Sequence, residues 1–258
     1  MRFSIITICW NNLEGLKNTH ASLSKQFFTN YEWIIVDGAS TDGTADYLKN
    51  FKDPGYIIVS EPDEGLYDAM NKGINLASGD YMVFMNSGDL FMAEDTLQIV
   101  SEEIDRHDKV AMIYGDALDY EPNGQTHYRK ARNHNTIYRG MFTQHQSMFF
   151  IRLDREKQPT YDLNYKFSAD YQFIIKYLQL EKQGYKIIKM SHPLSQFELG
   201  GLNETRRFQA MREDFLIRKN DLKLNPIKNK ALHFAHYIHT LLKIATPKIM
   251  MKFRYSKI

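Results

Sequence analysis

Five short runs of apolar residues recur through the first half of the chain, and a segment with helical spacing follows each of the first four. The runs are rich in β-branched residues and lack strict apolar–polar alternation, which is typical of strands buried on both faces of a parallel sheet. The runs cover residues 3–9, 32–38, 56–61, 81–86 and 110–116, and the helical segments cover residues 13–26, 44–51, 66–77 and 94–106. This alternation predicts βαβ units in an α/β fold, with the carboxyl ends of the strands along one edge of a mostly parallel sheet.

The pattern changes after about residue 120. Residues 169–183 have the spacing of an amphipathic helix that Gly184 ends, and a charged helix with Asn203 as its N-cap is expected later in the chain. A last helical segment is expected between Pro226 and Pro247. The chain therefore divides into an α/β half (1–118), a second region (119–222) and a helical tail (223–258).

The composition is that of an ordinary globular protein, with 258 residues, 43% of them hydrophobic and 25% charged. The one cysteine, Cys9, lies inside an apolar run and is expected to be a buried thiol in a reducing compartment. The first residues lack the long apolar segment of a signal peptide, and no window is apolar enough for a spanning helix. We therefore expect a cytoplasmic protein.

The charge is unevenly distributed along the chain, although the net charge is only +2. No acidic residue follows Asp221. The basic residues after it are Lys223, Lys228, Lys230, Lys243, Lys248, Lys252, Arg254 and Lys257. A basic helix with apolar residues is typical of contact with an anionic membrane surface, and the alternative is a helix docked on the protein's own core. No nucleic-acid-binding fold accompanies the basic charge, so nucleic acid is not expected as a partner.

Polar residues cluster where the predicted strands end. In open α/β sheets the ligand crevice lies outside the carboxyl ends of the strands. Carboxylates at neighbouring strand ends repel each other unless a cation or a donor-rich ligand lies between them. The clusters are Asn11-Asn12, Asp37-Gly38, Glu61-Pro62-Asp63, Asn86-Ser87-Gly88-Asp89 and Asp116. We expect these carboxylates to share a binding site.

The order and spacing of several motifs resemble the family 2 glycosyltransferases with the GT-A fold, and in particular those that make bacterial surface polysaccharides. The resemblance spans roughly residues 3–120, with weaker anchors as far as Arg206. Its carriers are "SIITICWNN", "IIVDGASTDGT", "SEPDEGLYDAMNKGINLASGDYMVFMNSGD" and "SADYQF". It implies a nucleotide-sugar-binding first half and an acceptor-side second region with the catalytic base, to which the residues themselves add the basic amphipathic tail.

The resemblance implies a set of donor-binding residues at the first three strand ends. Asp37 corresponds to the aspartate that binds the uracil or ribose side of the nucleotide, and Thr7 and Asn11 lie at the nucleoside edge. Asp63 is expected to reach the donor from the loop after the third strand. Many family members have an arginine where this chain has a methionine in "YDAMNK", and Lys72 is expected to supply the positive charge instead.

The segment "NSGD" corresponds to the metal-binding DxD signature of the family. Asp89 is the expected ligand of Mn²⁺ or Mg²⁺, because carboxylate oxygens suit hard cations that also bind phosphates. Ser87 occupies the position of the first aspartate, which departs from the signature and leaves the second protein ligand unidentified. Gly88 lets the backbone approach the diphosphate. The alternative for the whole segment is turn chemistry alone.

Two residues of the second region are candidates for work on the acceptor. Asp170 in "SADYQF" corresponds to the aspartate that acts as general base on the acceptor hydroxyl, and its alternative role is favourable charge at a helix N-terminus. His145 in "TQHQS" is a candidate for the acceptor pocket, and its alternative is a satisfied interior group.

The resemblance thus implies an inverting, metal-dependent transfer of a sugar from a UDP-sugar to a saccharide or lipid-linked acceptor. The tail adds peripheral attachment to the inner face of the cell membrane. Two other functions remain open from the sequence. One is a nucleotide-sugar-binding protein without activity, which the reduced "NSGD" signature would permit. The other is a nucleotidyltransferase, although "TICWNNLEG" lacks the glycine- and arginine-rich phosphate loop of that class.

Overall fold

The computed structural model describes residues 1–121, 124–199 and 206–246. The strands are β1 (Phe3–Cys9), β2 (Tyr31–Asp37), β3 (Tyr56–Ser60), β4 (Tyr81–Phe84), β5 (Leu90–Phe91), β6 (Val110–Tyr120), β7 (Thr126–Arg129), β8 (Met148–Ile151) and β9 (Lys186–Glu198). The α-helices are α1 (Leu13–Ser24), α2 (Thr44–Leu48), α3 (Leu66–Leu76), α4 (Thr96–Asp105), α5 (Ala169–Leu178), α6 (Arg207–Asn220) and α7 (Pro226–Ala245), and the short 3₁₀ helices are η1 (His134–Arg139), η2 (His145–Ser147) and η3 (Gln179–Gln183).

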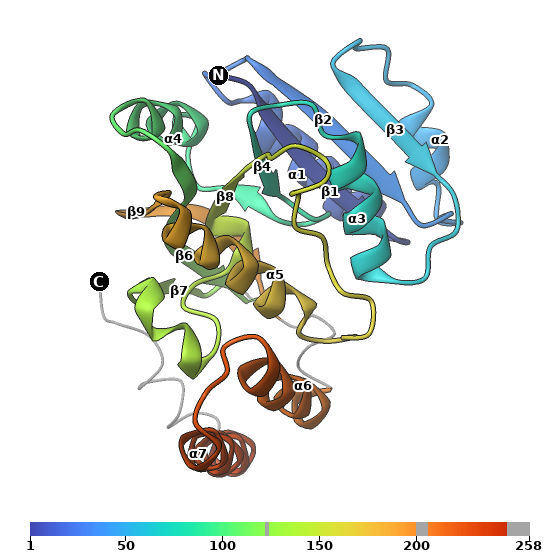
Figure 1. The fold of residues 1–258 in the computed structure, drawn as a ribbon. Helices are drawn as coiled ribbons and strands as arrows, with labels where there is room; N and C mark the ends of the chain where they lie inside the picture. Colours follow the sequence, from blue (N-terminus) through green and yellow to red (C-terminus); the bar gives the residue numbers. More distant parts are fainter. Residues whose placement is uncertain (122–123, 200–205, 247–258) are drawn as a thin grey trace.

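The described strands form one mixed sheet in the order β3-β2-β1-β4-β8-β6-β9-β5, with β7 paired to β6 (Figure 1). The strands β3, β2, β1 and β4 are mutually parallel, as the sequence predicts. The fifth predicted strand, β6, does not lie beside β4, because β8 from the second region pairs antiparallel with both. Two antiparallel steps restore the direction, so β6 still runs the same way as β4.

Helices cover both faces of this sheet. On one face, α3 and α5 pack against β1, β2 and β4 through a core that includes Met70, Phe84 and Phe173. On the other face, α1, α2 and α4 pack through a second core that includes Leu16 and Trp33. The helices α6 and α7 lie side by side at the end of the molecule away from α1 and α2 (Figure 1). Asn203 lies outside the described residues, and Arg206 is the residue before the first turn of α6.

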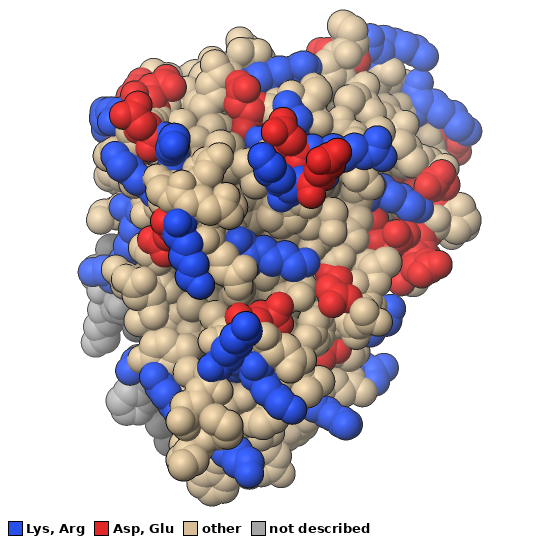
Figure 2. Space-filling model, viewed as in Figure 1, with Lys and Arg blue, Asp and Glu red and all other residues tan. Residues whose placement is uncertain are grey.

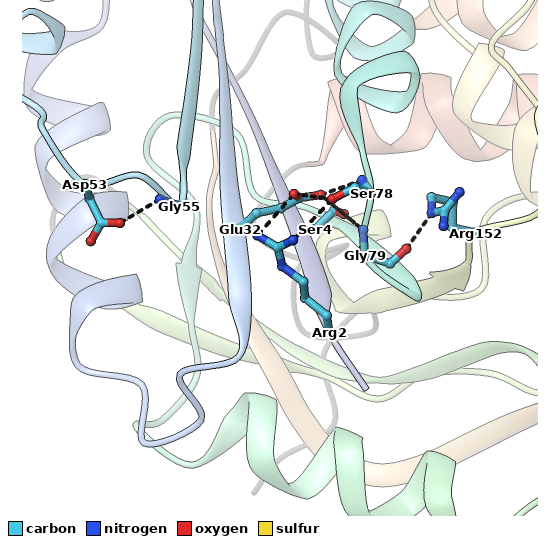
Figure 3. Close-up of polar contacts among 8 residues, drawn as sticks. All are labelled: Arg2, Ser4, Glu32, Asp53, Gly55, Ser78, Gly79 and Arg152. Carbon is cyan, nitrogen blue, oxygen red and sulfur yellow. Dashed lines mark hydrogen bonds and ion pairs between the residues drawn. The ribbon is translucent and has the colours of Figure 1, made fainter.

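A buried carboxylate ties the strands together at the edge opposite their carboxyl ends (Figure 3). Glu32 of β2 accepts hydrogen bonds from the hydroxyls of Ser4 and Ser78, both at 2.6 Å, and from the backbone N–H groups of Ser78 and Gly79. Arg2 lies 3.4 Å from the same carboxylate. Burial raises the pKa of Glu32, but these hydrogen bonds oppose it and hold the pKa below the ordinary value. This fully partnered group stabilises the fold and leaves nothing for a ligand.

Candidate active site

Asp37 is a buried carboxylate with one unused oxygen. It ends β2 and is fully buried. Its Oδ2 accepts hydrogen bonds from the hydroxyl of Ser60 at 2.6 Å and from the N–H of Ser40 at 3.2 Å. Its Oδ1 is buried and has no partner among the described residues. A buried polar atom without a partner is costly, so this oxygen marks a place where a ligand with an N–H or O–H group would gain binding energy.

Asn11 and Asp63 border Asp37 from the two neighbouring strands. Asn11 follows β1 with φ 48°, and its Oδ1 accepts a hydrogen bond from the N–H of Thr41 at 2.8 Å. Asp63 lies against the end of β2, since a Cβ added at Gly38 would come within 2.6 Å of its Oδ2. Glycine at position 38 therefore allows the Asp63 loop to close over the end of β2. The structure brings these three predicted residues together.

Thr7 and Lys72 have partners within the protein. Thr7 is fully buried under the site, and its hydroxyl oxygen accepts a hydrogen bond from the Trp33 indole N–H at 2.8 Å, so the structure does not bring it to the surface of the site. The ammonium of Lys72 lies 2.8 Å from Glu61 and donates to the carbonyl of Pro62 at 2.9 Å. The hydrogen bond to Glu61 raises the pKa of Lys72. Through these two contacts Lys72 stabilises the loop that contains Asp63.

The turn after β4 is held in place from two other elements. Gly88 has φ 103°, a conformation that favours glycine. Its N–H donates to the hydroxyl of Thr19 at 3.0 Å, and its carbonyl accepts from the hydroxyl of Tyr120 at 3.1 Å. The side-chain amide of Asn12 donates to the carbonyl of Ser87 at 3.0 Å. Because Asn12 follows β1, this contact joins the ends of β1 and β4.

Asp89 is buried at the end of this turn, with 5% of its surface exposed. Its Oδ2 accepts hydrogen bonds from the N–H of Asn86 at 3.0 Å and from the side-chain amide of Gln146 at 2.9 Å. Burial raises the pKa of Asp89 to about 7; the two hydrogen bonds oppose the shift, and the negative charge of Glu198 adds to it. A carboxylate held in this state gains strongly from a nearby cation.

The surroundings of Asp89 fit a divalent cation bound largely through oxygen. The side-chain oxygens of Asn86 and Gln146 are both buried without a partner among the described residues. The described part of the chain contains no group of three or more His, Cys, Asp or Glu residues placed to hold a metal ion. A cation here would therefore be held by Asp89, with amide oxygens and phosphate oxygens of a ligand completing its shell. Sequence reasoning missed Gln146, whose signal was its place beside His145 in a polar segment between apolar runs.

His145 lies in η2, beside the residue that contacts Asp89. The centre of its ring is 5.9 Å from the centre of the Phe84 ring, and its Nε2 is buried without a partner among the described residues. Burial lowers the pKa of His145 to about 4, so the imidazole is neutral at physiological pH. A neutral ring with one free nitrogen suits a hydrogen bond to a sugar hydroxyl.

Asp170 is the second residue of α5 and faces α3. Its Oδ1 accepts hydrogen bonds from the N–H of Tyr171 at 2.8 Å and from the hydroxyl of Tyr67 at 3.4 Å. Burial raises the pKa of Asp170 to about 6; the bond from Tyr171 opposes the shift, and the neighbouring charge of Asp214 adds to it. A carboxylate with this pKa is ionised at neutral pH yet basic enough to take a proton.

Asp116 does not join the other carboxylates, contrary to the prediction. It lies in the middle of β6, which continues to Tyr120. Both of its oxygens are used within the second region, one by the N–H of Ala131 at 2.7 Å and the other by the hydroxyl of Tyr128. The glycine pair Gly200-Gly201, which precedes the predicted charged helix in the sequence, lies outside the described residues.

The sequence and the fold are similar to those of known proteins. A family model described as Glycosyl transferase family 2 matches residues 4–177. A PGL/p-HBAD biosynthesis glycosyltransferase of Mycobacterium bovis is 32% identical over 178 residues, which are 67% of this chain and 68% of that protein. Two solved structures share the fold at 18% identity. Staphylococcus aureus TarS 1-349 in complex with UDP-GlcNAc has a TM-score of 0.67 over 90% of this chain and 70% of that one. The mannosyltransferase PcManGT from Pyrobaculum calidifontis, in complex with GDP-Man and Mn2+, has a TM-score of 0.66 over 95% and 72%.

Proposed function

The chain belongs to glycosyl transferase family 2, and on that basis we propose that it moves a sugar from a UDP-sugar to a hydroxyl of a saccharide or lipid-linked saccharide, with inversion, in the synthesis of a bacterial surface polysaccharide. The observation that carries the proposal is a pair of carboxylates with raised pKa values in different roles. Asp89 is contacted by Asn86 and Gln146, whose side-chain oxygens have no partner among the described residues, and Asp170 accepts a hydrogen bond from the hydroxyl of Tyr67 and lies near Asp214. A glycosyl transfer of this kind needs one carboxylate that binds a cation and a second that accepts a proton. Two carboxyl groups whose pKa values are raised in different surroundings fit that requirement.

The chemistry follows from these positions. Asp170 accepts the proton of the acceptor hydroxyl as that oxygen attacks the anomeric carbon. The bond from the anomeric carbon to the diphosphate oxygen breaks, and the nucleoside diphosphate leaves with the electron pair. Attack from the side opposite the leaving group inverts the anomeric configuration. Asp37, Asn11 and Asp63 bind and orient the nucleoside, and His145 contacts the acceptor.

Asp89 is the residue that would hold Mn²⁺ or Mg²⁺, and its carboxylate is contacted by Asn86 and Gln146, whose side-chain oxygens have no partner among the described residues. When bound, a divalent cation neutralises the charge of the diphosphate. The mannosyltransferase from Pyrobaculum calidifontis that shares this fold is described with GDP-Man and Mn2+, and S. aureus TarS with UDP-GlcNAc, which supports a nucleotide-sugar donor.

A thermal-shift screen of UDP-GlcNAc, UDP-glucose, UDP-galactose and GDP-mannose, with and without Mn²⁺, tests the proposed donor. A donor at 100 times its Kd stabilises the native state by about 2.7 kcal/mol, which for a chain of this size raises Tm by roughly 5–10 °C. We expect a UDP-sugar to give this shift only with Mn²⁺ present. The absence of a shift with all four donors would contradict the proposal.

Product analysis separates the enzyme from the two alternative functions. Turnover of the stabilising donor should release free nucleoside diphosphate, whereas a binding protein without activity would release none. A nucleotidyltransferase would instead consume a nucleoside triphosphate and release pyrophosphate. Of these outcomes, only the release of nucleoside diphosphate from the nucleotide sugar agrees with the proposal.

The tail helix α7 supports the further proposal that the protein attaches to the inner face of the cell membrane from the cytoplasm. One side of α7 docks on α6, where the buried side chain of Asn229 accepts a hydrogen bond from Arg218 at 2.8 Å. The other side carries exposed apolar side chains, namely Ile227, Phe234, Tyr237, Ile238, Leu241, Leu242 and Ile244. The charged side chains over the lower end of the molecule, where α7 lies, are lysine and arginine (Figure 2). The docked face of α7 fits the interpretation of a helix packed on the protein itself, and the exposed face supports the proposed membrane contact.

No helix in the described ranges combines the length and the apolar character that crossing a bilayer demands. An apolar face flanked by basic residues suits the interface of an anionic membrane. The basic residues of the predicted tail beyond Thr246 lie outside the described residues.

Vesicle binding tests this attachment. The double variant Phe234→Glu, Leu241→Glu puts two negative charges on the exposed face of α7 and should weaken binding to phosphatidylglycerol vesicles by at least about tenfold, because each charge costs both apolar contact and electrostatic attraction. Binding by the parent should fall as salt rises. Co-sedimentation measures both. The control Phe27→Glu, Leu76→Glu adds the same charge at two exposed apolar side chains elsewhere and should bind like the parent. Equal vesicle binding by both double variants would contradict the proposed membrane contact of α7.

A further inference from the structure

A carboxylate from α6 holds the segment that precedes the proposed base. Glu213 accepts hydrogen bonds from three successive backbone N–H groups. The donors are Lys166 to Oε1 and Phe167 and Ser168 to Oε2, each at 2.9 Å. Successive N–H groups that converge on one anion form a nest, and charge-assisted bonds of this kind are about twice as strong as neutral ones.

These three contacts fix the entry to α5. Ser168 is the N-cap residue of α5, yet its side chain makes no capping hydrogen bond. Its hydroxyl instead donates to the carbonyl of Ala210 in α6 at 3.2 Å. Asp170 lies two residues further along the chain. The position of its carboxyl group therefore depends on α6 as well as on its own helix.

The same helix sets the charge around Asp170. The ionisable groups around Asp170 are Tyr67 from α3, Tyr161 from the loop before α5 and Asp214 from α6, and the charge of Glu213 acts on Tyr67 and Asp214. The charge of Asp214 raises the pKa of Asp170, and burial raises the pKa of Asp214 itself to about 6. Loss of a negative charge from this group of residues makes Asp170 a weaker base.

We propose that Glu213 is a positioning residue, which holds the segment 166–168 so that Asp170 points at the acceptor hydroxyl. The inference rests on the proposed role of Asp170 as general base. A displacement of a catalytic group by about 1 Å can cost roughly 10² in rate. Loss of the Glu213 contacts therefore reduces turnover without touching the donor.

The docking of α6 does not depend on Glu213. The fully buried side chain of Arg218 joins α6 to α7, and Gln172 of α5 donates to Asp221 at 3.1 Å. Ile217 is fully buried in the core beneath α5. Removal of the Glu213 charge should therefore loosen the segment 166–168 while α6 stays in place.

The experiment compares Glu213→Gln with Asp221→Asn, an acid-to-amide change at the C-cap residue of the same helix, whose carboxylate accepts a hydrogen bond from Gln172 of α5 rather than from the segment 166–168. Turnover is measured as free nucleoside diphosphate released from the donor that the parent uses. We expect Glu213→Gln to lower kcat about 10- to 100-fold, to leave the donor Kd within about twofold of the parent, and to move the acid limb of the pH profile to lower pH. Asp221→Asn should keep the parent's kcat and pH profile. Glu213→Asp, which keeps the charge on a shorter side chain, should recover part of the loss, and it gives a second measurement if the glutamine variant does not fold.

Asp170→Asn and the double variant, measured in parallel, distinguish the possible failures. If Asp170→Asn keeps only residual turnover and Glu213→Gln adds no further loss to it, Glu213 acts through Asp170. An additive loss would overturn the inference, because Glu213 would then act on the fold as a whole. Normal turnover by Glu213→Gln, beside an Asp170→Asn variant with only residual turnover, would overturn the inference alone. Normal turnover by Asp170→Asn would overturn the proposed base and the inference with it.

Discussion

Asp89→Asn should make the metal-free protein more stable at pH 8 and at the same time abolish its stabilisation by Mn²⁺ with UDP. The two hydrogen bonds that Asp89 accepts both go to Oδ2, so an asparagine oxygen in that place keeps them. The buried negative charge disappears. The variant thus removes the destabilisation that the buried charge causes in the free protein, and it also removes the attraction of that charge for the metal ion in the complex.

The sign of the effect follows from the raised pKa. Folding moves the pKa of Asp89 from its ordinary value of 3.8 to about 7, so the unfolded chain ionises this group more readily than the folded one. The resulting penalty is absent below pH 3.8, grows up to pH 7 and is complete above it. Its size is on the order of 4 kcal/mol. Binding of Mn²⁺ to the parent should accordingly strengthen as the pH rises through 7.

Urea unfolding at pH 5 and pH 8, with and without Mn²⁺ and UDP, measures these effects. The difference between parent and variant should be larger at pH 8 than at pH 5. The exposed Asp154 provides a control, since Asp154→Asn should change neither the stability nor the response to metal. A variant at position 89 that is stabilised by Mn²⁺ and UDP as strongly as the parent would show that Asp89 does not hold the metal.

The first half of the fold could be predicted because its signals are local. Each buried strand is a continuous apolar run, and each helix lies between two of these runs. The strands β1 to β4 and their parallel direction therefore follow from the period of the pattern. The place of β8 could not be predicted. Its insertion between β4 and β6 is a pairing between residues far apart in the chain, and nothing in either segment specifies the partner.

The same distinction applies to the candidate site. Asp37, Asp89 and Asp170 stand in recognisable motifs; Asp37 and Asp89 are buried, Asp170 is half-buried, and desolvation raises the pKa values of Asp89 and Asp170. The groups that tune them come from elsewhere. Gln146 reaches Asp89 and Glu213 reaches the segment before Asp170 only after folding. Thr7 is the opposite case. It lies in the predicted strand β1, but its hydroxyl is hydrogen-bonded to Trp33 inside the protein and does not reach the surface of the site.

Asp170→Asn should reduce turnover by about 10² to 10⁴ while the donor binds as it does to the parent, because removal of a positioned general base typically costs that much in rate. Asparagine keeps the shape of the side chain and can still accept the bond from Tyr171. It cannot accept a proton from the acceptor. The fold should not suffer, since burial already disfavours the charge of Asp170.

The pH profile identifies the group that is lost. With a pKa of about 6, Asp170 is protonated in acid, so the parent's kcat/KM should fall about tenfold per pH unit below pH 6. The residual activity of Asp170→Asn should lack this limb. Tyr67→Phe is the matched control, because it removes the hydrogen bond that favours the ionised carboxylate and leaves the base in place. The acid limb of the pH profile of Tyr67→Phe should move to higher pH, and turnover at pH values above that limb should be retained. If Asp170→Asn instead keeps both its rate and its acid limb, the proton goes to another group, and if it loses only donor affinity, Asp170 belongs to the nucleotide site.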